Sequence, residues 1–581
     1  TLVSGRELPM HLGLPTRSVH GLPIIEHAEF GRNVPDEAMP DEDKMNLGKI
    51  YHMGKEEAAG LILNRQAMAS HTFITGSTGT GKSNAVYHLL DEITKNGQTT
   101  FLVVEPAKGE YKNVFGNCTD VQVFGTNPRE TPLLRMNPFA FPENIHILEH
   151  IDRLVEIFNA CWPMYAAMPA VLKDAIERSY QKVGWDLRNS ESEKGVFPTF
   201  FDLLDILPGV IEESHYSKDT QSDYVGALCT RVKSLTNGIY GSVLCAEDAL
   251  TDEALFDRNV IVDLSRVGSM ETKSLLMGIL VMKLQEYRMC SSGMNSRLRH
   301  VTVLEEAHNL LRKTSAEQSQ EGANLQGKSV EMLANAIAEM RTYGEGFIIA
   351  DQAPGLLDMS VIRNTNTKII LRLPDEEDRK LVGKSAALKE AQIDELSKLP
   401  LGVAAVYQNE WPEAVLCKIE AYPMPENAVY HKPSKMPHEI NAEFVFGQLA
   451  VGKELEPLSS SEMEQLKLWL KRHETVLKPE DSRYLERVFA GGELDVAKTR
   501  KAVFDFFGGI GTVVDYCVAA EKSLTPRKEF LEQLQGQYGL KAAAADWVLN
   551  SVISMGMSLN PDAKAVDNLR TNFEQQGGRV L

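Results

Sequence analysis

The sequence lacks the features that mark membrane-spanning, secreted and disulfide-bonded proteins. No run approaches about 20 uninterrupted apolar residues, so a transmembrane helix is not expected. A basic-then-apolar leader is absent as well. The seven cysteines are scattered without a C-x-x-C pair, which argues against both a disulfide framework and a zinc site. We therefore expect reduced thiols, no membrane insertion and a cytoplasmic location.

The chain also lacks a surplus of positive charge. Its 61 basic and 80 acidic residues give a formal net charge of −19, which excludes a surface that is basic all over. That balance still allows nucleic acid as a ligand, because a ring or channel can be acidic outside and basic only where the strand passes. Charge alone therefore excludes little.

The length of 581 residues exceeds what one hydrophobic core usually supports, so we expect one large domain with attached pieces. Residues 1–50 are rich in proline and glycine and are interpreted as an N-terminal arm or partial small domain. Residues 51–425 have the pattern of an α/β core, interrupted at 126–254 by a mainly helical insertion. After a proline-rich break, residues 426–581 are predicted to be mainly helical.

The core pattern alternates short apolar runs with amphipathic segments, which is typical of a mostly parallel sheet covered on both faces. The expected fold class is therefore α/β. The buried-strand candidates are His71–Ile74, Phe101–Val104, Val260–Val262, Val301–Leu304, Phe347–Ala350, Ile369–Leu371 and Val403–Tyr407. The clearest helical segments are Ser83–Lys95, Ile145–Ala160, Met168–Val183, Tyr224–Thr236, Ser461–Arg472, Val496–Phe507 and Pro526–Tyr538.

A glycine-rich loop between the first strand and the first helix matches G-x-x-x-x-G-K-[ST]. Its glycines let backbone N–H groups converge on phosphates at a helix N-terminus, where the dipole favours anions. Lys82 is expected to reach the β- and γ-phosphates, and the Ser83 hydroxyl to ligate Mg²⁺. The predicted ATP-binding residues are Gly76, Ser77, Thr78, Gly79, Thr80, Gly81, Lys82, Ser83 and Asn84.

Hydrolysis also needs an acid that positions the metal and a group that polarises water. The apolar strand 301–304 delivers two adjacent carboxylates, Glu305 and Glu306, at its carboxyl end. In a parallel sheet that end faces bound ligands. We assign Glu305 to the magnesium and Glu306 to the attacking water. Aspartate is usual at the first position, so Glu305 is a longer variant.

Further short motifs occur in a fixed order around these two. They are E-P-A-K-G-E-Y at residues 105–111, M-N-P at 136–138, L-E-E-A-H-N-L at 304–310 and A-D-Q-A-P at 350–354. Over roughly residues 46–422 the series resembles the HerA branch of the HerA–FtsK ATPases. Conjugative secretion ATPases share much of the pattern.

The resemblance implies a RecA-like P-loop core, a homo-hexameric ring and ATP-driven translocation of double-stranded DNA. It also implies that Gln352 senses the γ-phosphate and that Arg341 faces the neighbouring subunit's nucleotide as an arginine finger. Arg363 and Arg372 are alternatives for that role. Family members usually have arginine after the sensor glutamine, whereas this chain has Ala353.

Several assignments stay open at the level of sequence. Glu105 either helps to hold the metal or a water, or caps the turn that follows its strand. The segment Arg312–Lys328 is either a mildly basic pore loop that touches phosphates or an ordinary surface loop. His308 is expected to pack or to hydrogen-bond nearby. The aromatic cluster of Phe504, Phe506 and Phe507 is interpreted as core.

Three functions fit these features. The first is a hexameric DNA translocase or helicase motor, with a nuclease-type partner in DNA processing or phage defence. The second is a conjugation or secretion motor that acts on a polypeptide or a secretion complex. The third is an ATP-dependent scaffold for an effector protein. We favour the first.

Overall fold

The protein divides into two units. Unit 1 holds Thr1–Leu134, Phe141–Ala170 and Thr251–His431, and unit 2 holds Arg135–Ala140, Val171–Leu250 and Lys432–Leu581. This computed structural model describes residues 18–20, 27–35, 39–165, 167–192, 196–214, 216–246, 249–314, 325–424, 429–432, 483–485, 487–488, 495–522, 525–538, 542–578 and 580.

Unit 1 is built on a sheet that has eleven strands within the described residues, in the order β2-β1-β13-β12-β11-β3-β10-β9-β4-β8-β5. Neighbours from β11 to β5 run parallel, and those from β2 to β11 run antiparallel. The expected mostly parallel α/β sheet is confirmed. The strands are β1 Lys44–His52, β2 Lys55–Asn64, β3 Thr72–Thr75, β4 Thr100–Glu105, β5 Val121–Gly125, β8 Asn259–Asp263, β9 His300–Glu305, β10 Glu345–Asp351, β11 Thr367–Ile370, β12 Val403–Gln408 and β13 Val415–Ile419.

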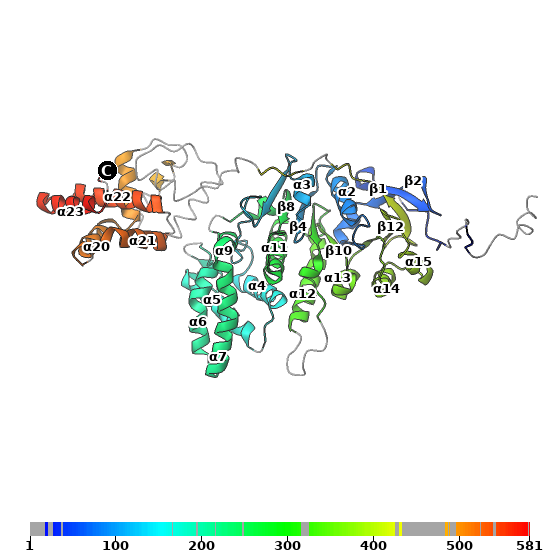
Figure 1. The fold of residues 1–581 in the computed structure, drawn as a ribbon, viewed down its shortest axis with the longest axis horizontal. Helices are drawn as coiled ribbons and strands as arrows, with labels where there is room; N and C mark the ends of the chain where they lie inside the picture. The colour runs from blue at the N-terminus through cyan, green and yellow to red at the C-terminus, as the bar shows by residue number, and fades with distance from the viewer. Residues whose placement is uncertain are drawn as a thin grey trace, which may run out of the picture. The chain divides into compact units, whose positions relative to one another are not determined.

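Helices cover both faces of this sheet because its central strands are apolar on both sides. Every residue of β8, β9 and β10 is buried. Helices α2 and α3 lie on one side of the sheet, and α12 and α13 lie on the other (Figure 1). Helix α4 packs against α11 and α12. The helices of unit 1 are α2 Lys82–Thr94, α3 Tyr111–Phe115, α4 Ile147–Cys161, α10 Asp252–Phe256, α11 Met270–Ser291, α12 Leu325–Glu339, α13 Met359–Arg363, α14 Glu376–Ser385 and α15 Glu390–Glu395.

The parallel strands β3, β10, β9, β4 and β8 are neighbours and end along one edge, which we name the carboxyl edge; the opposite edge is the amino edge. Four of the five end in an acid: Asp351 on β10, Glu305 on β9, Glu105 on β4 and Asp263 on β8. Parallel pairing in register brings these side chains to the same border of the sheet.

Four strands of this sheet were not foreseen from the sequence: β1, β2, β5 and β13. Strand β1 pairs with β13 and crosses residue 50, so residues 44–50 belong to the same sheet as the core. The pairing of β1 with β2 is irregular, with register shifts after Asn46 and after Lys49. Such shifts break the alternation of period two by which a half-buried strand is recognised.

Unit 2 contains the helices of the insertion and those near the C-terminus. Two of the expected helical segments, Met168–Val183 and Tyr224–Thr236, are helical in this unit, whereas the helices Phe200–Glu213, Lys218–Tyr224 and Gly238–Leu244 were not named from the sequence. A short hairpin of β6 (Trp185–Asp186) and β7 (Glu191–Ser192) follows the first segment. The insertion contributes α5 Met168–Lys182, α6 Phe200–Glu213, α7 Lys218–Tyr224, the π-helix η3 Val225–Cys229, α8 Thr230–Thr236 and α9 Gly238–Leu244. The C-terminal helices are α19 Val496–Phe506, α20 Gly509–Lys522, α21 Pro526–Tyr538, α22 Ala542–Leu559 and α23 Ala563–Gln575.

The C-terminal helices share an apolar core of their own. Phe504, Phe506 and Phe507 are buried in it, as expected. The predicted helix Ser461–Arg472 lies outside the described residues. Within the described residues no single helix is long and apolar enough to cross a membrane; the bent pair Ala497–Phe506 and Gly509–Ala520 passes that test by length and composition.

Candidate functional site

The glycine-rich loop connects β3 to α2 at the carboxyl edge, as its motif predicts. Gly81 has φ of 104°, a conformation that side chains rarely adopt, and α2 begins at the next residue. A Cβ atom on Gly76 would lie 2.7 Å from Leu371 and from the Thr80 hydroxyl. The loop is pinned from outside by the Ser77 backbone N–H, which donates to the carbonyl of Arg372 at 3.0 Å. These contacts hold the loop at the N-terminus of α2, where the helix dipole favours an anion.

Lys82 lies between the two acids that follow β9. Its Nζ is 2.8 Å from Glu305 Oε2 and 3.4 Å from Glu306 Oε1, and all three groups are largely buried. Burial disfavours the charge on Lys82, but the two carboxylates outweigh it and hold the lysine pKa above its ordinary value. The lysine and both acids named from the sequence therefore meet in one cluster.

Glu305 has a second partner that the sequence did not reveal. The Tyr111 hydroxyl donates to Glu305 Oε1 at 2.5 Å, while Lys82 occupies Oε2. Burial, together with the adjacent carboxylate, keeps the Tyr111 pKa well above its usual range, so the phenol stays a donor. Tyr111 is the last residue of the E-P-A-K-G-E-Y segment. Its aromatic residue type was the one feature of the sequence that could have pointed to this contact.

Glu105 positions the turn that carries Tyr111. Its carboxyl oxygens accept from the backbone N–H groups of Glu110 at 2.8 Å and Tyr111 at 3.1 Å. Burial raises the pKa of Glu105 to about 8. Of the two roles considered for this residue, the contacts match the cap of the following turn.

Glu306 and Gln352 are brought together above the phosphate loop. Gln352 Nε2 donates to Glu306 Oε1 at 2.6 Å, and the Thr78 hydroxyl donates to Gln352 Oε1 at 2.7 Å. The glutamine thus bridges the loop and the second acid. It lies directly after β10, the strand between β3 and β9, which explains how it reaches both.

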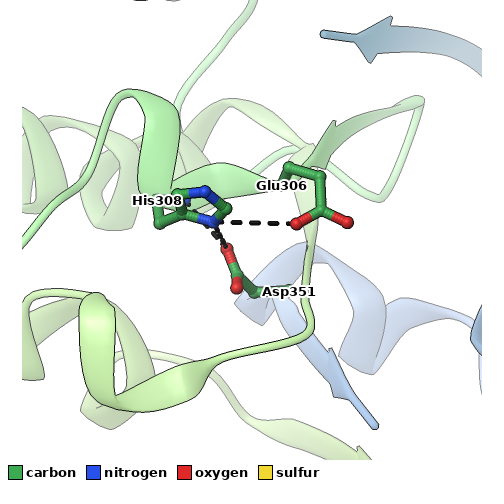
Figure 2. Close-up of side chains that lie close together, drawn as sticks. All are labelled: Glu306, His308 and Asp351. Carbon is green, nitrogen blue, oxygen red and sulfur yellow. Dashed lines mark hydrogen bonds and ion pairs between the residues drawn. The ribbon is translucent and has the colours of Figure 1, made fainter. Parts of the chain in front are cut away.

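A histidine completes the surroundings of Glu306. His308 Nδ1 is 2.9 Å from Asp351 Oδ2 and 3.7 Å from Glu306 Oε2 (Figure 2). The hydrogen bond to Asp351 raises the His308 pKa above its ordinary value. The ligand-type atoms of these three residues lie within 4.8 Å of one another, close enough to hold a metal ion. The expectation that His308 hydrogen-bonds nearby is confirmed.

Asn84 and Ser83 were also predicted for the nucleotide site, and their surroundings differ from those of the cluster around Lys82. Asn84 uses its side chain on the segment after β13, accepting from the Tyr422 N–H at 2.9 Å and donating to the Glu420 carbonyl at 3.0 Å. Ser83 occupies the second position of α2 and is partly exposed. A hydroxyl and a carboxylate are oxygen donors of the kind that Mg²⁺ prefers, so Ser83 and Glu305 fit that ion chemically.

The three candidate arginines lie at different edges of the sheet. Arg341 lies in the short helix Met340–Tyr343 before β10, and Arg363 ends α13 before β11, so both precede their strands at the amino edge. The seven residues of β10 separate Arg341 from Asp351 by on the order of 20 Å. Arg372 instead follows β11 and holds the phosphate loop through its carbonyl.

The structure describes part of the segment Arg312–Lys328, for which a pore loop was one of two interpretations. Arg312 forms an antiparallel bridge with Leu357, and the Lys313 N–H donates to the Leu356 carbonyl at 2.8 Å. Both cationic side chains are exposed. Residues 315–324 lie outside the described residues.

Comparison with known proteins shows which proteins the chain resembles. A family model described as the helicase HerA central domain matches residues 45–283. The DNA double-strand break repair helicase HerA of Sulfolobus acidocaldarius is 25% identical over 393 residues, covering 65% of this chain and 69% of that protein. A protein of Methanocaldococcus jannaschii named as a probable helicase is 23% identical over 436 residues, covering 68% of this chain and 76% of that protein.

The solved structure of VirB4 of Thermoanaerobacter pseudethanolicus has the same fold. It superposes with a TM-score of 0.50 at 19% identity and covers 66% of this chain and 98% of that chain. The sheet order, the phosphate loop and the acids of β9 are thus set in a RecA-like P-loop core. Residues 45–283 match the HerA central domain, so this chain, with its P-loop ATPase core, is similar to the HerA helicases over about two thirds of its length.

Proposed function

We propose that this chain is the ATP-hydrolysing subunit of a homo-hexameric ring that translocates or remodels double-stranded DNA. The observation that carries the proposal is the single cluster formed by Lys82, Glu305, Glu306 and Gln352 beside the phosphate loop. Each of these four side chains lies within hydrogen-bonding distance of another member of the cluster.

The residues divide the work of hydrolysis. The loop N–H groups and Lys82 bind the phosphates, and Gln352 reports the γ-phosphate through its link to Thr78. Glu306 orients the attacking water and accepts its proton. Ser83 and Glu305 would hold Mg²⁺, which neutralises charge on the β- and γ-phosphates when bound. Lys82 exchanges its contacts with the two carboxylates for contacts with the phosphates when the nucleotide binds.

The trans arginine follows from the position of Arg341. It lies at the amino edge, on the order of 20 Å from the phosphate loop of its own chain, which supports a role at the site of a neighbouring subunit; Arg363 at the same edge is an alternative for that role. An arginine delivered in this way contributes about 10³–10⁵ in rate. Arg372 is the alternative that acts beside its own loop.

The DNA assignment draws on the relatives, which are named as DNA double-strand break repair helicases. The exposed Arg312 and Lys313 are suitable contacts for phosphates. A nuclease-type partner, in DNA processing or phage defence, belongs to the same proposal. A conjugation or secretion motor, or a scaffold for an effector, is the alternative.

The catalytic assignment is tested with Glu306→Gln. We expect it to bind ATP normally and to hydrolyse it about 10²–10⁴-fold more slowly, because the water loses its base. Unchanged hydrolysis would remove Glu306 from the mechanism. Duplex DNA added at low salt should raise the wild-type rate, since phosphate contacts are strongest there. A rate indifferent to DNA, with no DNA binding, would favour the secretion or scaffold function.

The trans arrangement is tested by mixing two inactive variants. Lys82→Ala destroys its own site but offers an intact Arg341, and Arg341→Ala has the opposite defect. Mixed rings should therefore recover hydrolysis at the interfaces that combine the two intact halves. No recovery, in rings shown by particle images to be mixed, would indicate that Arg341 does not act in trans. Arg372→Ala provides the comparison, because a residue acting in its own subunit gains nothing from the mixture with Lys82→Ala.

A further inference from the structure

The turn after β9 holds Glu306 in an unfavourable backbone conformation. Its φ and ψ are 45° and 52°, in the left-handed region that non-glycine residues seldom occupy. Such a conformation persists only where surrounding contacts determine it, and it occurs preferentially at functional sites. One set of contacts comes from Asn309, whose backbone N–H and side-chain amide donate to the Glu306 carbonyl at 2.9 and 2.7 Å.

A second set of contacts comes from Asp351 at the end of the neighbouring strand. Asp351 is fully buried. Its Oδ2 accepts the His308 backbone N–H and lies 2.9 Å from the His308 ring, while its Oδ1 accepts from the Ala353 N–H at 2.9 Å. Asp351 therefore ties the turn that presents Glu306 to the segment that presents Gln352.

The imidazole of His308 lies between two carboxylates. Its Nδ1 faces Asp351 Oδ2 at 2.9 Å and Glu306 Oε2 at 3.7 Å (Figure 2). The other Glu306 oxygen is bound by Gln352. The charged groups that face the ring are Asp351 on β10, Glu306 in the same turn and Arg312 in the segment that follows, of which only the arginine disfavours a charged imidazole.

We infer that His308, clamped by Asp351, is the positioning residue that holds the Glu306 carboxylate in its water-orienting place; this rests on the proposed role of Glu306. Lys82 and Gln352 are the partners that move toward a bound nucleotide. His308 stays, because both its backbone and its ring are bonded to the buried Asp351. When the other contacts are withdrawn, the His308 ring, whose Nδ1–H donates to Asp351 Oδ2, remains beside Glu306 Oε2 at 3.7 Å as its ion-pair partner.

The same three side chains would suit a transition metal by ligand type and spacing. The contacts favour the hydrogen-bonded arrangement, because both oxygens of Asp351 already accept backbone N–H groups and Nδ1 is placed to donate. A metal at this position is therefore treated as a competing outcome of the test.

The test uses three replacements of His308 in the full chain. His308→Ala should lower kcat about 10²-fold, as a misplaced catalytic group does, with KM for ATP and binding of a non-hydrolysable analogue within about twofold of wild type. His308→Asn places an amide N–H near the position of Nδ1 and should recover most of the rate. His308→Gln places its amide near the position of Nε2 and should not.

The split between kcat and analogue binding separates positioning from a structural role, because a residue that only supports the fold affects both. An unaltered kcat in His308→Ala, or equal losses in kcat and analogue binding, would overturn the inference. So would a His308-dependent rate that disappears with a transition-metal chelator and returns with Zn²⁺ or Mn²⁺. Glu306→Gln measured alongside separates the two proposals: activity in that variant refutes the role of Glu306, whereas an inactive Glu306→Gln with a normal His308→Ala refutes only this inference.

Discussion

The two edges of the unit 1 sheet both hold buried charges, but they hold them in different ways. At the amino edge, Glu345 accepts from Arg288 Nε at 2.9 Å, from the Thr302 hydroxyl at 2.8 Å and lies 2.7 Å from His300 Nδ1. Arg288 also donates to Asp257 at 2.7 Å. Glu345, Thr302 and His300 lie on strands, Arg288 lies on the long helix α11 and Asp257 directly follows α10, so the network is anchored in regular structure.

At the carboxyl edge, Gln352 and Thr78 lie on loops, and Lys82 is the first residue of α2. Lys82 and Gln352 each contact Glu306, and Gln352 also contacts Thr78, which is exposed on the phosphate loop. A buried ion pair adds little stability over an apolar pair of the same shape, whereas removal of one partner is costly. We therefore expect amino-edge variants to lose stability, and carboxyl-edge variants to lose activity.

The largest effect should come from Glu345→Leu at the amino edge. It leaves Arg288 and His300 buried without their shared carboxylate, which typically costs about 3–5 kcal/mol. Urea unfolding followed by circular dichroism should show this loss, with hydrolysis per folded molecule unchanged. The control is the exposed Glu339→Gln on α12, expected to change the free energy of unfolding by less than about 0.5 kcal/mol. Equal stability of the two variants would contradict a network anchored in regular structure.

Lys82→Met should show the opposite profile at the carboxyl edge. Loss of the lysine that contacts developing phosphate charge should slow hydrolysis about 10²–10³-fold, equivalent to about 3–4 kcal/mol in the transition state. The fold should persist, since Glu305 keeps the Tyr111 hydroxyl and Glu306 keeps Gln352. Single-turnover ATPase assays and a thermal melt measure the two quantities. A variant that unfolds would remove the distinction between the edges.

The carboxyl edge could be predicted largely from sequence because its signals are local. An apolar run followed by Glu305 and Glu306 predicts a buried strand and places the two acids at its carboxyl end. The glycine pattern predicts the phosphate loop. Tyr111 holds Glu305, and Asp351 holds His308. Each of these links joins two segments that are far apart in the sequence. Patterns of spacing within one segment contain no information about such pairs.

The amino-edge network was invisible for the same reason. Arg288, His300 and Glu345 lie on three different elements, and each alone is an ordinary charged or polar residue. The missed strands have another cause. In β1 the alternation of Met45 and Leu47 is interrupted by irregular pairing, and β2 contains the residues E-E-A-A-G, which favour strands poorly.

The pH dependence of stability tests a buried histidine at the amino edge, His71, which directly precedes β3. Burial lowers the pKa of His71 to about 4, below its ordinary value of 6.5. The unfolded chain therefore binds a proton that the folded chain refuses, so stability is complete above pH 6.5 and falls as the pH drops toward 4, by about 1.4 kcal/mol per unit. His71→Asn should flatten this slope, since its amide oxygen can accept the Phe347 N–H that now donates to Nδ1. Parallel slopes for the two proteins would exclude His71 as the origin.

The smallest effect should distinguish two buried tyrosines, one at each edge. The Tyr111 hydroxyl holds Glu305 at the carboxyl edge, and the Tyr287 hydroxyl donates to Asp257 at the amino edge. Tyr111→Phe frees one oxygen of the proposed metal carboxylate, and loss of such outer contacts weakens metal affinity about 10-fold or more. The Mg²⁺ concentration for half-maximal hydrolysis should rise accordingly, and so should the Kd for Mn²⁺ measured by electron paramagnetic resonance in the presence of ADP. Tyr287→Phe removes an equivalent hydroxyl from a carboxylate with no ligand to bind, so its metal dependence should match wild type. If both variants shift alike, the tyrosines support the fold in general, and the contrast between the edges does not extend to their hydroxyl groups.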